Sequence, residues 1–162
     1  MTHFCETLAN TVLKACRERS LILTTVESCT GGLIAANLTS IPGSSDVFDC
    51  GFIVYSNESK TNLVGVCPEL IKTYKSVSKE VAIAMAEGGL KYSRASISVA
   101  VTGIAGPGKA CLDKPVGLVH CATAYKNHAP MHQEMRFGNS DRNIIRYTAV
   151  ENALKLILAY FQ

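Results

Sequence analysis

The chain has 162 residues, of which 48% are hydrophobic and 18% are charged, and its formal net charge is +3. This length supports one globular domain with a sizeable core, and we predict a single domain over residues 1–162. The basic residues are scattered along the chain, which argues against a nucleic-acid-binding surface. A small anionic molecule is a sufficient partner for a charge of this size.

Neither end of the chain carries a targeting or membrane signal. The first twenty residues contain no uninterrupted apolar run of the signal-peptide kind, and the C-terminal stretch ALKLILAYF is far shorter than the roughly 20 residues that a spanning helix needs. We therefore predict a cytoplasmic protein with no membrane partner. The seven cysteines are odd in number and form no CxxC pair, and the histidines lack metal-ligand spacing, so we predict neither a disulfide framework nor a metal site.

The first third of the chain alternates between helix and strand patterns. Residues 21–26, LILTTV, are typical of a buried strand, and the turn ESCTGG leads into a short helix over residues 33–38. The loop SIPGSS covers residues 40–45, and residues 47–55, VFDCGFIVY, predict a second strand because they are rich in β-branched and aromatic side chains. Before them, an N-terminal amphipathic helix is predicted with Cys5, Leu8, Ala9, Val12 and Cys16 on its apolar face.

Three helices are predicted in the middle of the chain. Ser56 or Asn57 is positioned to cap a helix that runs through residues 60–64, and a second short helix follows Pro68, since proline is tolerated in a first turn. Ser78 caps the third, longer helix. The residues expected on one face of that helix are Val81, Ala84, Met85, Gly88 and Tyr92.

Three more strands and a closing helix complete the predicted fold. The strands cover residues 97–101, 116–125 and 133–137, and the last two form a hairpin around KNHAP. Ser140 or Asp141 begins the final helix, whose core stripe is Val150, Leu154, Ile157, Leu158 and Phe161. This order predicts a layered α/β/α fold with a mixed β-sheet of about five strands flanked by helices.

The segment VTGIAGPGKA matches most of a phosphate-binding P-loop. Gly103 to Lys109 satisfy the spacing GxxxxGK, but Ala110 stands where the motif requires serine or threonine. Pro115 follows six residues after Lys109 and a strand pattern begins at once, which leaves no room for the helix that a P-loop needs. We therefore interpret the segment as a glycine-rich loop at a strand end, where the backbone can approach a ligand closely.

The turn ESCTGG is the first candidate for chemistry. Ser28, Cys29 and Thr30 offer a nucleophile or hydrogen bonds to a ligand, and amides at the start of the following helix favour an anion. Capping of that helix by Ser28 or Thr30 is the alternative, and the segment alone supports both equally.

Three further side chains are candidates. A lysine such as Lys60, in the first turn of a helix, has its charged form disfavoured, and burial lowers its pKa further, as a general base requires. A solvated surface lysine is the commoner alternative. Arg142 is expected near a helix start. It either binds a phosphate or carboxylate in bidentate fashion or forms a surface ion pair with Asp141. Ser45 in PGSS, taken alone, is an ordinary turn residue.

Taken together and in order, ESCTGG, PGSS, GFIVYSNESK, AVTGIAGPG with KPVG, and FGNSDR resemble the CinA C-terminal domain family, the nicotinamide mononucleotide amidohydrolases also called PncC. The resemblance runs from about Thr24 to the final helix. It implies a stand-alone deamidase domain, without the molybdopterin-binding-like domain of longer CinA proteins. The implied reaction converts nicotinamide mononucleotide and water into nicotinate mononucleotide and ammonia, without a metal or organic cofactor.

The resemblance also implies roles for individual residues. It assigns the nucleophile to Ser45, the general base to Lys60 and a proton relay to Tyr55, with Ser28 as the rival nucleophile. The residues expected to bind substrate are Thr30, Gly31, Thr102, Gly103, Gly106 and Arg142. A homo-oligomer is expected. Two alternatives stay open: a nucleotide-binding module without turnover, suggested by the unusual loop KACLD, and hydrolysis through Cys29.

Overall fold

The structure, a computed structural model, describes residues 2–108 and 112–162, with side chains from residue 5 onward. Within these residues the strands form one sheet in the order β2-β1-β3-β4-β5. Their bounds are β1 (Leu23–Glu27), β2 (Phe48–Ile53), β3 (Ile97–Gly103), β4 (Leu118–Tyr125) and β5 (Met131–Arg136). β1 pairs in parallel with β2 and β3, whereas β4 is antiparallel to both β3 and β5. The predicted mixed sheet of five strands is confirmed.

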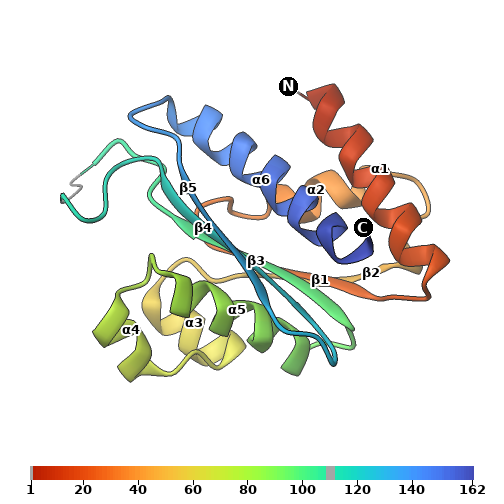
Figure 1. Cartoon of the computed structure of the whole chain (residues 1–162), viewed down its shortest axis with the longest axis horizontal. Coiled ribbons are helices and arrows are strands. Elements are labelled where there is room, and N and C mark those ends of the chain that lie inside the picture. The colour runs from red at the N-terminus through yellow and green to blue at the C-terminus, as the bar shows by residue number, and fades with distance from the viewer. Residues whose placement is uncertain (1, 109–111) are drawn as a thin grey trace.

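Helices cover both faces of this sheet, so the predicted layered α/β/α fold is also confirmed. In the described part of the chain they are α1 (Thr2–Glu18), α2 (Leu33–Thr39), α3 (Asn57–Val64), α4 (Pro68–Tyr74), α5 (Lys79–Lys91) and α6 (Arg142–Leu158), with short 3₁₀ turns at Ser44–Asp46 and Ala159–Phe161. α1, α2 and α6 lie on one face, and α3, α4 and α5 lie on the other (Figure 1).

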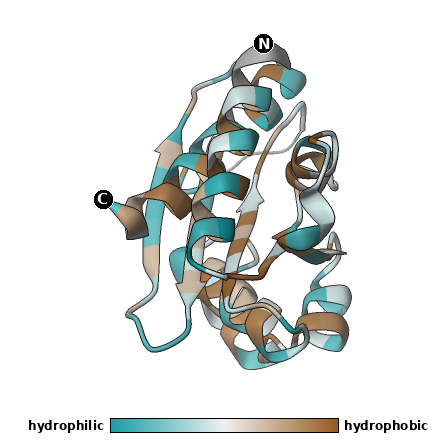
Figure 2. Ribbon diagram, turned by 90° about the vertical axis from the view of Figure 1, so that its right-hand side faces the viewer, coloured by the Kyte–Doolittle hydropathy of each residue, from teal (hydrophilic) through white to brown (hydrophobic). Residues whose placement is uncertain are grey.

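The core lies on both faces of the central strands. All residues of β1 are buried, as are nearly all of β3 and β4, whereas β2 and β5 at the two edges are largely half-buried or exposed. Hydrophobic residues accordingly concentrate on the strands and on the helix surfaces that face them (Figure 2). Strands buried on both faces are rich in apolar and β-branched residues, which made the central strands recognisable in the sequence although they also carry buried polar residues such as Thr25, Ser98 and His120.

Two helix faces differ in part from their predictions, and in α5 small residues make the close contacts with the sheet. In α5, Ala84 is only half-buried and Tyr92, just beyond the helix, is 50% exposed, while Ala82, Ala86 and Gly89 are buried against the sheet. In α6 the stripe begins earlier than predicted. Its buried residues are Ile145, Ala149, Val150, Ala153, Leu154 and Ile157, and the predicted Leu158 and Phe161 are half-buried.

The helix starts agree with the capping patterns, and the strand ends shift by a few residues. Ser56 caps α3 by accepting a hydrogen bond from the Ser59 amide at 3.0 Å, and Ser78 caps α5. Asp141, not Ser140, caps α6. β1 begins two residues later than predicted, β2 ends before Val54, and β5 begins two residues earlier, because pairing with neighbouring strands sets these limits.

Candidate active site

Several of the predicted site residues, but not Ser45, converge at the carboxyl ends of the parallel strands β1 and β3. The last residue of β1, Glu27, pairs with Ile53 in β2 and Val101 in β3, so the turns that follow the three strands begin at the same edge of the sheet. The start of α6 and the β3–β4 connection lie at this edge as well (Figure 1). Ligand sites of open α/β sheets form at such edges.

Lys60 is buried at this edge. It is the fourth residue of α3, its side chain is 1% exposed, and its amine lies 3.1 Å from Oγ of Ser28. The same amine donates to the carbonyl oxygens of Val54 at 2.9 Å and Tyr55 at 3.2 Å. Burial lowers the pKa of Lys60 below its usual value, since the charged form loses its hydration.

The three neighbours of the amine fit its neutral form. A neutral amine has two N–H bonds and one lone pair. When the two N–H groups donate to the carbonyls of Val54 and Tyr55, the lone pair is left for the hydroxyl of Ser28. In this arrangement Ser28 donates a hydrogen bond to the Lys60 amine. A Lys60 ammonium would instead donate to Ser28 in the same contact.

Ser28 and Lys60 face a cavity of about 150 Å³. Its lining residues come from five separate segments of the chain: Ser28, Cys29, Tyr55, Lys60, Ser76, Val77, Thr102, Gly103, Ala105 and Arg142. The cavity is therefore bounded by the β1–α2 turn, the β2–α3 connection, the α4–α5 loop, the end of β3 and the start of α6.

The structure does not bring Ser45 to Lys60, which corrects the expected pairing of these two residues. Ser45 lies in the 3₁₀ turn Ser44–Asp46 before β2, is exposed, and neighbours the end of α1, where Arg17 pairs with Asp46 at 3.4 Å. Lys60 follows the other end of β2. Six residues of strand separate the two ends by about 20 Å. Ser28 is the hydroxyl that lies beside Lys60.

Tyr55 and Arg142 meet at the mouth of the cavity. The Tyr55 side chain is 64% exposed, and its hydroxyl lies 3.4 Å from Nη2 of Arg142. Arg142 also donates to the carbonyl oxygen of Gly106. The Tyr55 hydroxyl contacts Arg142, and the Tyr55 carbonyl accepts from the Lys60 amine, so the expected proton relay through the Tyr55 hydroxyl stays a prediction. Arg142 remains directed at the site and not toward Asp141, which caps α6.

The glycine-rich segment after β3 forms a wall of the cavity. Thr102 and Gly103 line it, and the Thr102 hydroxyl donates to the Ser76 carbonyl at 2.8 Å. A Cβ on Gly103 would lie 2.7 Å from the Val119 side chain, so the close pairing of β3 with β4 requires glycine there. The next described element is β4, not a helix, in agreement with the rejection of a P-loop. Residues 109–111, including Lys109 and part of KACLD, lie outside the described residues.

The expected anion site at the start of α2 is filled by the protein itself. The buried Glu27 carboxylate accepts hydrogen bonds from the amides of Gly32 at 3.0 Å, Ile34 at 3.1 Å and Ala35 at 2.9 Å. Neither Ser28 nor Thr30 caps the helix. Thr30 is fully buried, and neither Thr30 nor Gly31 is among the cavity-lining residues. The structure therefore does not place Thr30 or Gly31 where a substrate in this cavity would contact them.

Cys29 lines the cavity, but its thiol is not activated. Burial raises the pKa of Cys29 to about 12, so the group is a neutral thiol near pH 7. A nucleophilic cysteine needs the thiolate, which requires a lowered pKa. The alternative of hydrolysis through Cys29 therefore lacks support from the structure.

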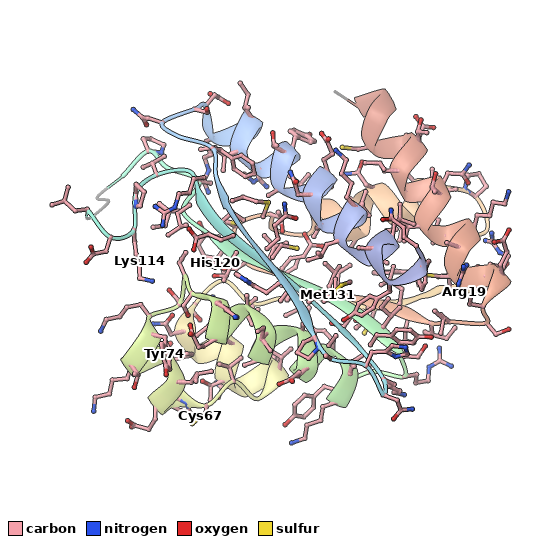
Figure 3. All side chains as sticks on the ribbon, in the orientation of Figure 1. Arg19, Cys67, Tyr74, Lys114, His120 and Met131 are labelled. Atoms are coloured by element: carbon pink, nitrogen blue, oxygen red, sulfur yellow. The ribbon has the colours of Figure 1, made fainter. Side chains whose placement is uncertain are left out.

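Several site residues were missed in the sequence. Ser76 and Val77 wall the cavity, and Lys114, labelled in Figure 3, extends toward α4 and α5 and donates to the Val77 carbonyl. Arg146 contacts the turn that carries Ser28. A signal for Arg146 was present, since it follows Arg142 by four residues on one helix and therefore shares its face. Nothing in the local pattern of Ser76 or Val77 marked them.

With this geometry established, comparison with known proteins gives the family. Residues 5–161 match the family described as the CinA C-terminal domain, and the chain belongs to it. A CinA-like protein of Acidobacterium capsulatum is 49% identical over 152 residues, which cover 94% of this chain and 36% of that protein. The chain thus spans little more than a third of the length of the curated relatives it matches.

Solved structures cover the chain almost completely. The competence/damage inducible protein CihA from Agrobacterium tumefaciens is 46% identical, with a TM-score of 0.96 over 98% of this chain and 96% of that one. The competence damage-inducible protein A from Klebsiella pneumoniae is 32% identical, with a TM-score of 0.91 over 98% of this chain and 99% of that one. In the part of the chain that the structure describes, no helix is long and apolar enough to cross a membrane.

Proposed function

We propose that the protein hydrolyses the carboxamide of nicotinamide mononucleotide to nicotinate mononucleotide and ammonia, with Ser28 as nucleophile and Lys60 as general base. The observation that carries this proposal is the 3.1 Å contact between the Ser28 hydroxyl and a buried lysine amine whose pKa is lowered. The substrate is suggested by the resemblance to the amidohydrolases of the CinA family. No metal or organic cofactor enters the proposed reaction.

In the first half of the reaction, Oγ of Ser28 attacks the carboxamide carbon as its proton passes to the neutral amine of Lys60. The resulting tetrahedral intermediate carries a negative oxygen, and the proposal assigns its stabilisation to backbone N–H groups of Gly103 and Ala105, residues that line the cavity. The ammonium of Lys60 then protonates the amide nitrogen. The C–N bond breaks, ammonia leaves and a Ser28 ester remains.

The second half restores the enzyme. A water molecule attacks the ester carbon and gives one proton to Lys60, which in turn protonates Oγ of Ser28 as the ester bond breaks. The products are free enzyme and the carboxylic acid, which loses its remaining proton to solvent to give the carboxylate. Lys60 thus transfers a proton in each half and returns to its neutral form, which its burial favours.

The size of the cavity sets the expected placement of the substrate. A volume of about 150 Å³ is small beside the roughly 300–1,000 Å³ of pockets that enclose a whole ligand of drug size. We infer that only the carboxamide-bearing ring enters and that ribose and phosphate stay at the mouth. Arg142, held there by Gly106 and near the Tyr55 hydroxyl, is the cation available to the phosphate.

The proposal is tested with three alanine variants and an assay of ammonia release from nicotinamide mononucleotide. Ser28→Ala and Lys60→Ala should each lower kcat/KM by at least about 10³-fold, because each removes a member of one catalytic unit. Ser45→Ala is the matched control and should stay within about twofold of wild type, since Ser45 is exposed at the other end of β2.

Two results would contradict the proposal in different ways. Full activity in Ser28→Ala together with loss in Ser45→Ala would overturn the assignment of the nucleophile. Tight binding of the mononucleotide by the wild-type protein without ammonia release would instead support the alternative of a nucleotide-binding module. Assembly into a homo-oligomer and a cytoplasmic location stay predictions.

A further inference from the structure

The turn that carries Ser28 is held by a side chain from the far end of the sequence. Arg146, in α6, donates through Nε to the carbonyl oxygen of Cys29 and through Nη2 to that of Thr30, both at 3.1 Å. These carbonyls follow Ser28 directly along the chain. Arg146 is half-buried, and it is not among the residues that line the cavity, in contrast to Arg142.

Two further sets of hydrogen bonds hold the same turn. The Ser28 amide donates to the Val101 carbonyl of β3 at 3.0 Å. The Glu27 carboxylate, just before Ser28, binds three amides at the start of α2. The strand, the helix and Arg146 therefore all hold one segment of residues 27–35.

This segment needs external support because its own residues are permissive. Gly31 and Gly32 have φ values of 59° and 97°, a region where glycine is favoured and where its conformational freedom is large. The hydroxyl of Ser28 must nevertheless stay within hydrogen-bond reach of Lys60. A displacement of about 1 Å at a reacting group lowers rates by about 10²-fold.

We propose that Arg146 is a positioning residue that holds the Ser28 hydroxyl in register with the Lys60 amine by fixing the carbonyls of Cys29 and Thr30. This inference rests on the proposed function, because it concerns the same serine. Arginine suits the task because its planar fork presents two N–H groups to two acceptors at once. Lysine offers a single point of attachment on a flexible stem and cannot reproduce that geometry.

The test compares Arg146→Lys and Arg146→Ala with Arg136→Lys. Arg136 is a matched control, since it is an exposed arginine on β5 paired with Glu134 at 2.7 Å. Both Arg146 variants should lower kcat for ammonia release by about 10- to 100-fold and leave KM within about threefold. Added methylguanidinium should restore part of the kcat of Arg146→Ala, and the control should match wild type.

A second measurement makes the outcome independent of the substrate. Amide hydrogen exchange over residues 28–33 should be faster in both Arg146 variants than in wild type, while exchange in β4 stays unchanged. If either kcat or exchange over residues 28–33 matches wild type in the Arg146 variants, the positioning role is wrong. A raised KM with normal kcat would instead make Arg146 a substrate-binding residue, which also overturns the proposal.

The two proposals can fail separately. If wild-type protein releases no ammonia from the mononucleotide, the proposed function falls, and hydrogen exchange alone decides whether Arg146 holds the Ser28 turn. If wild type is active and Arg146→Lys is as active as wild type, the positioning role falls and the proposed function stands.

Discussion

At the scale of single residues, the most informative feature is Lys60, which is buried and forms no ion pair with a carboxylate among the residues that the structure describes. Its neighbours are two carbonyl oxygens and one hydroxyl, which satisfy a neutral amine fully. A buried ammonium is normally paired with an anion, because an isolated charge is expensive to remove from water. The carboxylate of Glu27, just before Ser28 in the chain, is committed to the amides of α2. These residues therefore favour an amine that accepts protons.

The Cys29 thiol provides a prediction at this scale. With its pKa near 12 and its side chain 5% exposed, Cys29 should resist iodoacetamide at pH 7.5 for hours, while the exposed Cys67 reacts within minutes. Peptide mass spectrometry identifies the alkylated sites. Cys67→Ser is the control, and it should remove the rapid alkylation at position 67 and leave Cys29 as slow as in wild type. Rapid alkylation of Cys29 with loss of ammonia release would revive hydrolysis through the thiol.

At the scale of elements, the site depends on how closely α3 and α5 approach each other. α3 carries Lys60, and its C-terminal end packs on α5 at Gly88. A Cβ built on Gly88 would lie 2.0 Å from the carbonyl oxygen of Val64, a contact with backbone that cannot move aside cheaply. Glycine is unfavourable inside a helix, and Gly88 is found in α5 because only glycine permits this close contact with α3.

Gly88→Ala is expected to lower the free energy of unfolding by about 1–3 kcal/mol or more, because the added methyl group forces α3 and α5 apart. Urea denaturation followed by circular dichroism measures the change. Gly108→Ala is the matched control, since a Cβ there would meet nothing within 4 Å, and its stability should stay within about 0.5 kcal/mol of wild type. Equal stability of the two variants would show that the helices do not need this close approach.

At the scale of the whole molecule, the pKa of Lys60 links the site to stability. Its native pKa lies below the ordinary value of 10.5, so between those two pH values the unfolded chain binds more protons than the folded one. The free energy of unfolding must then rise with pH in that window. Below the native pKa the folded protein carries the buried ammonium, so the contribution of Lys60 to stability stays at its lowest, pH-independent value.

Lys60→Met should remove this dependence. The variant is expected to be at least as stable as wild type at pH 7, and the stability of wild type should approach that of the variant as the pH rises toward 10. The total rise equals about 1.4 kcal/mol for each pH unit by which the native pKa lies below 10.5. Urea denaturation at several pH values gives both curves. Parallel curves for the two proteins would mean that Lys60 titrates normally.

Much of the fold followed from local patterns in the chain. Apolar and β-branched residues predicted the central strands β1, β3 and β4, because strands buried on both faces are rich in them even where single polar residues such as Thr25 intervene. Ser56 and Ser78 marked helix starts through capping chemistry, which acts over three residues. The edge strand β5 was placed less well, since its limits depend on pairing with β4 and its sequence is mostly polar.

Sequence by itself determined the candidate residues Ser28, Lys60 and Arg142 and the family resemblance, because each belongs to a short motif with its own chemistry. Only the tertiary structure decided which serine meets the lysine. Ser28 and Ser45 both lie in turns beside strands, and spacing along the chain does not tell at which end of the sheet a turn lies. The parallel pairing of β1 with β2 places Ser28 and Lys60 at one edge and Ser45 at the other. Arg146 is 117 residues from Cys29 in the sequence. It reaches the Ser28 turn only because the fold brings the start of α6 next to the β1–α2 turn, which no local sequence pattern shows.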